Sequence, residues 1–174
     1  MEVEHRNIKY PRIEYRTGIR KLILPFGANP ADITNKYEKW ISAKESFIKT
    51  TSEAATQLHT DEMQLNELVK LINNQVIAHS KELGVVVKRV QFRKLFSKWG
   101  SCSVNGNLCF NSLLRYIPKR IIKYVVYHEM IHLIERKHNY KFWQMIEEKY
   151  PAHSKYEEEL FGYWFLINKE RGKK

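Results

Sequence analysis

Apolar and polar side chains alternate along residues 8–25, and apolar side chains then recur at helical spacing through most of the chain. The alternating set consists of Ile8, Tyr10, Ile13, Tyr15, Ile19 and Ile23. Period-two alternation is typical of strands with one buried face, and Gly18 is available for a turn. The pattern therefore predicts an N-terminal antiparallel sheet, built as a hairpin or short meander.

A helical pattern follows the pair Asn29 and Pro30. Asparagine is a good N-cap and proline suits the first helical position, so we expect a helix to begin there. Its apolar face continues to Ile48. Threonines and a serine then interrupt the pattern, which predicts a connector over residues 51–60.

A second helix is expected after the connector, with Thr60 as its cap and Gly84 at its end. Its apolar stripe consists of Leu65, Leu68, Val69, Ile72, Val76 and Leu83. We expect His59 and His79 on the surface, since histidine side chains are more often exposed than buried in a core.

A β-rich region comes next. Val85 to Phe92 is rich in β-branched residues and predicts a strand, and residues 99–111 predict a hairpin. If Asn105-Gly106 forms a two-residue turn, Cys102 faces Cys109 across that hairpin. Two cysteines are too few for a disulfide framework, so we expect free, mostly buried thiols in a reducing compartment.

Three more helical patterns complete the chain, from Pro118 to about Glu135, from Tyr140 to Tyr150 and from Ser154 to Asn168. Strands and helices in this order predict an α+β fold, with the N-terminal sheet packed on helices. We expect a single domain over residues 1–174, with strands and the first helix in 1–50, the connector in 51–60, the helix, hairpin and core in 61–168 and a basic tail in 169–174.

The candidate chemistry lies in the helix that begins after Pro118. His128 and His132 are one turn apart and share a face, so both imidazoles can hold one metal ion. Glu129 lies beside that pair, where its carboxylate can take a proton from water, as expected for His-Glu-x-x-His in metal hydrolysis. Because the helix has hardly any polar face, burying these three side chains is costly unless they are paired or bind metal.

His138 is the natural third ligand if the chain turns back after about Glu135 or Lys137. The spacing equals that of the metzincins, but Glu135 stands where their bend has glycine. His138 can instead be a surface residue, and the alternative third ligands are Glu157, Glu158 and His153. Three neutral ligands with one open position describe a catalytic zinc, with Glu129 as general base.

Two further features bear on catalysis. A donor for the developing oxyanion is needed besides the metal, and the able side chains are Asn111, Arg115, Tyr140 and His153. Leu108 to Ser112 is a candidate edge strand that could pair with an extended substrate; the alternative is an internal strand with no substrate role.

Several short motifs accompany the histidines. They are Lys98-Trp99-Gly100-Ser101-Cys102-Ser103, Gly106-Asn107, Phe110-Asn111, Tyr124-Val125-Val126, His128-Glu129-x-x-His132-Leu133, His138, Phe142-Trp143 and Pro151. Together they resemble the YgjP-like metallopeptidases, small intracellular zincin-like proteins related to the SprT-like and WLM groups. The resemblance is close over about residues 85–166 and implies a zincin-like fold. It also implies that His128, His132 and His138 are the metal ligands and that Glu129 is the catalytic acid and base.

Charge and composition bear on partners and location. The chain has 30 Lys and Arg against 19 Asp and Glu, a net charge of +11, which suits either an anionic partner such as nucleic acid or a charge-rich surface. No apolar run reaches membrane length, and the N-terminus has no apolar signal-peptide region. We therefore expect a cytoplasmic protein with no membrane partner.

Three functions compete at this stage. The first is a zinc metallopeptidase, a hydrolase that cleaves a peptide or protein substrate. The second is a metal-dependent hydrolase of nucleotide phosphoanhydrides, such as a pyrophosphatase, which the basic charge would suit. The third is a DNA-associated module that keeps a zincin scaffold without hydrolysis.

Overall fold

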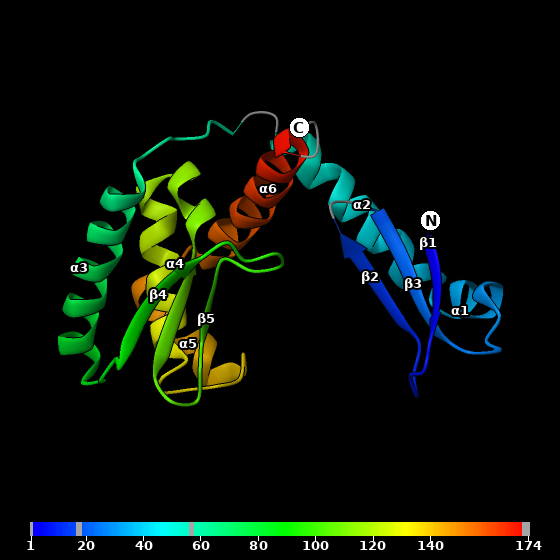
Figure 1. The fold of residues 1–174 in the computed structure, drawn as a ribbon, viewed down its shortest axis with the longest axis horizontal. Coiled ribbons are helices and arrows are strands. Elements are labelled where there is room, and N and C mark those ends of the chain that lie inside the picture. Colours follow the sequence, from blue (N-terminus) through cyan, green and yellow to red (C-terminus); the bar gives the residue numbers. More distant parts are fainter. Residues whose placement is uncertain (1, 17–18, 56–57, 172–174) are drawn as a thin grey trace. The chain divides into compact units, whose positions relative to one another are not determined.

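The computed structural model describes residues 2–16, 19–55 and 58–171. Helices and two three-stranded mixed sheets make this an α+β protein, as predicted (Figure 1). The chain divides into two compact units, one of Met1–Leu58 with Phe161–Lys174 and one of His59–Leu160. The expectation of a single domain stays a prediction.

The first unit contains the sheet of β1 (Glu2–Arg6), β2 (Arg12–Arg16) and β3 (Ile19–Pro25), in the order β1-β3-β2. β2 and β3 form the expected antiparallel pair, whereas β1 runs parallel to β3. The antiparallel pairing predicted within residues 8–25 is therefore confirmed, and the parallel strand β1, which lies before that range, was not predicted because its residues lack the alternation. The turn expected at Gly18 lies outside the described residues.

The first unit also contains α1 (Pro30–Lys36) and α2 (Glu38–Ala55). The Asn29 side chain accepts a hydrogen bond from the Ala31 amide at 3.0 Å, which confirms the predicted cap. The helix breaks at Tyr37, where the apolar pattern had predicted continuity. α2 then continues to Ala55, so the predicted connector is helical over its first half. The hydroxyl of Thr50 is satisfied within the helix by the Ser46 carbonyl, at 3.0 Å, so threonine does not stop it.

The second unit contains the remaining sheet and most of the remaining helices. They are α3 (Leu65–Leu83), β4 (Arg89–Arg93), β5 (Gly100–Cys102), β6 (Asn107–Asn111), the 3₁₀ helix η1 (Ser112–Tyr116), α4 (Lys119–Ile131), α5 (Tyr140–Lys149) and the start of α6 (His153–Arg171). The strand order is β4-β6-β5, with β4 parallel and β5 antiparallel to β6. α3 packs along α4, and the core between helices and sheet is apolar.

The C-terminal end of α3 lies where it was predicted, and the N-terminal end does not. Gly84 ends it at a φ of 65°, as expected. Its start is Leu65, not Asp61, because Gln64 and Glu67 form a capping box that Thr60 does not. His79 is buried, with 4% exposure, so its predicted surface position is wrong. His59 is exposed as predicted.

The hairpin of β5 and β6 has a different register from the predicted one. Ser103 and Asn107 close a three-residue loop in which Gly106 has a φ of 75°. Cys102 therefore pairs with Leu108. Since neighbouring residues of a strand point to opposite faces, Cys102 and Cys109 do not face each other, and both thiols are free and half-buried.

The C-terminal helices follow the prediction closely. α5 begins at Tyr140 as expected, and α6 continues to Arg171, beyond the predicted end at Asn168. The first residues of the expected loose tail are therefore helical. Among the described residues, no helix is both long and apolar enough to span a membrane.

Candidate metal centre

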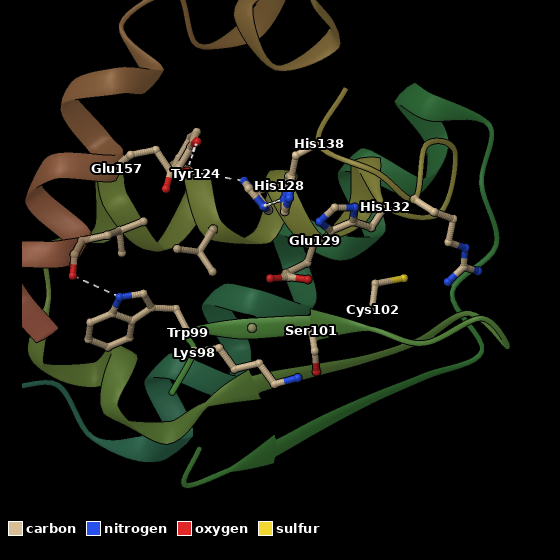
Figure 2. A pocket seen from close by; sticks show the side chains of 14 residues that line it. Lys98, Trp99, Ser101, Cys102, Tyr124, His128, Glu129, His132, His138 and Glu157 are labelled. Atoms are coloured by element: carbon tan, nitrogen blue, oxygen red, sulfur yellow. Dashed lines mark hydrogen bonds and ion pairs between the residues drawn. The ribbon is translucent and has the colours of Figure 1, made fainter. Parts of the chain in front are cut away.

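Three imidazoles converge at the carboxyl end of α4 (Figure 2). His128 lies in the last turn of the helix and His132 is its C-cap residue. His138 follows the helix and points back towards them. One nitrogen from each ring lies within 4.8 Å of the other two, and the Nε2 atoms of His128 and His138 are 3.0 Å apart. The three side chains are thus placed to hold one metal ion.

A tight turn brings His138 back. α4 ends at Ile131, four residues before the predicted end at Glu135. The Glu135 amide still donates to the Ile131 carbonyl at 2.8 Å, while the Glu135 side chain accepts from the Lys137 amide at 3.2 Å. Hydrogen bonds to Glu135 thus hold the bend where the metzincins have glycine. Asn139 then caps α5 by accepting from the Phe142 amide at 3.1 Å, which fixes the chain directly after His138.

The hydrogen bonds around the rings determine which nitrogens face the shared centre. His132 Nδ1 lies 3.1 Å from the Glu135 carbonyl oxygen, which can only accept, so Nδ1 carries the proton. The Nε2 atom of His132 is then left with its lone pair. His128 presents Nε2 to His138, and its Nδ1 is 3.6 Å from Glu157 Oε1. His128 and His132 can therefore each offer Nε2 as a metal ligand.

The surroundings keep two of the imidazoles neutral. Burial lowers the pKa of His128 to about 3, with His132 and His138 acting in the same direction. Burial also lowers the pKa of His132. Phe142 packs against all three rings, with centroid distances of 4.6 to 4.9 Å. Neutral imidazole is the form that binds a metal, so the site is prepared for one at neutral pH.

Glu129 is buried, with 8% exposure, between the histidines and β5 (Figure 2). Burial raises the pKa of its carboxyl group to about 8; the positive charge of Lys98 opposes that shift and Glu157 adds to it. A Cβ atom at Gly100 would lie 2.6 Å from Glu129 Cγ and 2.7 Å from Oε1. Glycine at position 100 therefore makes room for the carboxylate beside the three rings.

A cavity of about 480 Å³ opens on this cluster. Besides the histidines and Glu129, its walls are Lys98, Trp99, Gly100, Ser101, Cys102, Tyr124, Val125, Arg136, Glu157 and Leu160. One wall is β5, an edge strand of its sheet. Of the two alternatives for Leu108 to Ser112, an edge strand or an internal strand, the structure supports the internal one, because β6 lies between β4 and β5. The Trp99 indole donates to the Leu160 carbonyl at 3.1 Å and joins β5 to α6 at the rim of the cavity.

Residues 29–162 match the family model described as YgjP-like, metallopeptidase domain. The chain belongs to the YgjP-like family. The family implies a catalytic metal, typically zinc, and a peptide substrate.

This YgjP-like chain is similar to the crystal structure of the metallopeptidase zymogen of Pyrococcus abyssi abylysin, with a TM-score of 0.42 and 20% sequence identity over 47% of this chain and 81% of that one. No curated protein matches the chain.

None of the four oxyanion candidates is among the residues that line the cavity of the YgjP-like site. Asn111 is buried and donates to the carbonyls of Leu95 and Lys98 at 2.9 Å, so its role is structural. Tyr140 is 83% exposed, and His153 stacks on Trp143. Arg115 donates to the neighbouring Tyr116 hydroxyl.

Sequence reasoning missed two cations that line the cavity of this YgjP-like chain, Lys98 and Arg136. Lys98 directly precedes Trp99-Gly100, so the motif itself could have drawn attention to it. Of the alternative third ligands, only Glu157 lines the cavity.

Proposed function

We propose that this protein is a zinc-dependent peptidase in which His128, His132 and His138 bind the metal and Glu129 is the general base. The observation that carries the proposal is the convergence of three ring nitrogens within 4.8 Å of one another beside a buried carboxylate. Nitrogen donors of this number and type fit a catalytic zinc site, which has three protein ligands and one open position.

A zinc ion held there would act as a Lewis acid on a substrate carbonyl and lower the pKa of a water at its open position to about 7. Glu129 takes a proton from the attacking water and later gives it to the leaving amine. Burial raises the pKa of Glu129 and so its affinity for that proton, while the charge of a zinc ion beside it would lower the pKa and favour the carboxylate. The lack of a side chain at Gly100 leaves room for this carboxylate in the cavity.

The edge strand β5 supports a peptide as the substrate. Its residues Gly100–Cys102 pair with β6 along one edge, and in this proposal an extended chain pairs with the other edge. The same strand lines the cavity beside Glu129. A peptide paired with β5 would therefore run past the three imidazoles.

Replacing Glu129 by Gln tests the assignment of the base. The variant should bind one zinc ion as the natural protein does, while hydrolysis of a casein-derived peptide library falls by about 10²- to 10⁴-fold, because only the proton carrier is lost. Zinc content and product formation are measured on the same samples. A variant that cleaves peptides at an undiminished rate would refute the role of Glu129. Nucleoside triphosphates tested in parallel should not be hydrolysed.

A further inference from the structure

The wall of the metal cavity formed by α6 contains a carboxylate aimed at the far side of His128. Glu157 lies in the part of α6 that belongs to the second unit, and its Oε1 atom is 3.6 Å from His128 Nδ1. Figure 2 shows Glu157 and Tyr124 together on the side of His128 opposite His132. Glu157 is half-buried, and its Oε1 atom lies slightly beyond hydrogen-bond distance of His128 Nδ1, close enough for the carboxylate to act on the ring electrostatically.

Tyr124 holds that carboxylate in place. It lies one helical turn before His128 on α4, and its hydroxyl donates to the same Oε1 atom of Glu157 at 2.5 Å. The ring of Tyr124 is fully buried, stacked on Tyr156 at 5.1 Å and edge-on to Tyr150 at 5.3 Å. A phenol fixed in this way orients its hydroxyl, and the hydroxyl in turn orients Glu157.

A carboxylate can only accept a hydrogen bond, so Glu157 favours the form of His128 in which Nδ1 carries the proton. Nε2 then keeps its lone pair on the side of His138, the side on which the metal would bind. The Glu135 carbonyl does the same for His132. Outer partners of this kind orient metal-binding histidines and raise their basicity.

We infer that Glu157, held by Tyr124, is the positioning residue that fixes the tautomer and orientation of His128 for metal binding. The inference rests on the proposed function, since it gives His128 the role of a ligand. Glu157, one of the alternative third ligands in the sequence analysis, is then a partner of the ligand His128 and not a ligand itself.

Nitrogen-15 NMR of histidine-labelled, metal-free protein tests the tautomer directly. In the natural protein, His128 should be in the form protonated on Nδ1. Glu157→Ala should shift it towards the form protonated on Nε2, which is the usual preference in water. Glu158→Ala is the matched control, because Glu158 is the adjacent, exposed carboxylate outside the cavity, and it should leave the His128 signals unchanged. His128 signals that are the same in all three proteins would overturn the inference.

Zinc affinity, measured by competition with a chelator, tests the consequence. Glu157→Ala should weaken binding by about 10- to 100-fold, the usual effect of losing an outer partner. Glu157→Gln should weaken zinc binding less, since an acceptor oxygen remains. The zinc affinity of Tyr124→Phe should lie between those of Glu157→Ala and the Glu158→Ala control. Equal affinities in Glu157→Ala and Glu158→Ala would contradict the inference even if Tyr124→Phe does not fold.

The visible spectrum of the Co²⁺-loaded protein separates a partner from a ligand. Glu157→Gln should keep the intensity and shape of the absorption bands, because the coordinating atoms are unchanged; a changed coordination number would show that Glu157 is itself a ligand and refute the inference. These readouts do not depend on turnover. If they succeed while no peptide is cleaved, the proposed function fails and the placement of His128 stands.

Discussion

At the scale of single residues, the site depends on one position without a side chain. Gly100 lies on β5 directly against Glu129, and a Cβ atom there would be 2.6 to 2.8 Å from three atoms of the Glu129 side chain. Real Cβ atoms do not approach other atoms so closely, so the carboxylate would have to move. The flexible group that yields is the proposed base itself.

We therefore expect Gly100→Ala to reduce peptide hydrolysis at least tenfold, because a displacement of about 1 Å misaligns the base. Zinc affinity should change little, since the three histidines are not in the clash. Steady-state kinetics and a chelator competition measure the two effects separately. Undiminished turnover in the alanine variant would mean that Glu129 does not act from its observed position.

The sequence predicts the convergence of His128, His132 and His138 because their spacing is local and a helix has a fixed period. The structure brings the three together, and their role as ligands stays a prediction. The contributions of Gly100 and Glu157 could not be derived in the same way. Each depends on an element distant in sequence packing against α4, and helical periodicity carries no information about that packing.

At the scale of elements, the end of α4 and the start of α5 position the third histidine. The Asn139 side chain caps α5 through the Phe142 amide, directly after His138. Replacing Asn139 by Ala removes this acceptor and should lower the free energy of unfolding by about 1 kcal/mol. Urea denaturation checks the value, and Asn139→Asp, which keeps an acceptor, should restore most of it. Equal stabilities of the alanine variant and the natural protein would show that the cap does not contribute.

A charged cluster joins the ends of α3 and α5. Lys149 donates to both carboxylate oxygens of Glu82 at 2.5 Å, and His79 lies 2.9 Å from one of them. The hydrogen bond from Lys149, followed by that from His79, lowers the pKa of Glu82 below its ordinary value of 4.5. A carboxyl group whose pKa is lower in the folded state stabilises the protein above its unfolded pKa, and this contribution is lost as the pH falls through the folded value.

Glu82→Gln should therefore destabilise the protein at pH 7 by about 0.5 to 1 kcal/mol, a value that allows for the partial exposure of the pair. The difference should shrink as the pH falls below about 4.5, where the natural side chain also becomes neutral. Thermal unfolding of both proteins between pH 3 and 7 measures this. A difference that is constant over that range would rule out the charge as its cause.

The elements also show why some boundaries were predicted and others were not. Asn29 and Gly84 determine helix ends through their own side chain or backbone, and both ends are confirmed. The hairpin register depended on choosing a two-residue turn, whereas the chain uses three residues with Gly106 in the left-handed region. With one more residue in the loop, Cys102 pairs with Leu108 instead of Cys109, and the two cysteine side chains point to opposite faces of the sheet.

At the scale of the whole molecule, all the proposed site residues belong to the unit His59–Leu160. The α+β class was predicted because strand and helix periods differ clearly along the chain. The order of the strands was not, since it depends on contacts between distant segments. The net charge of +11 is a property of the full chain, and it enters neither the proposed chemistry nor the placement of the histidines.

The proposed function depends on three histidines that bind one divalent cation. A crystal of the zinc-treated protein, measured at the zinc absorption edge, tests it most directly. We predict one anomalous peak per chain, about 2.0 to 2.1 Å from a nitrogen of His128, His132 and His138. In crystals of His138→Ala the peak should weaken or disappear. A map with no peak among the three rings, or with the zinc bound elsewhere, would contradict the account.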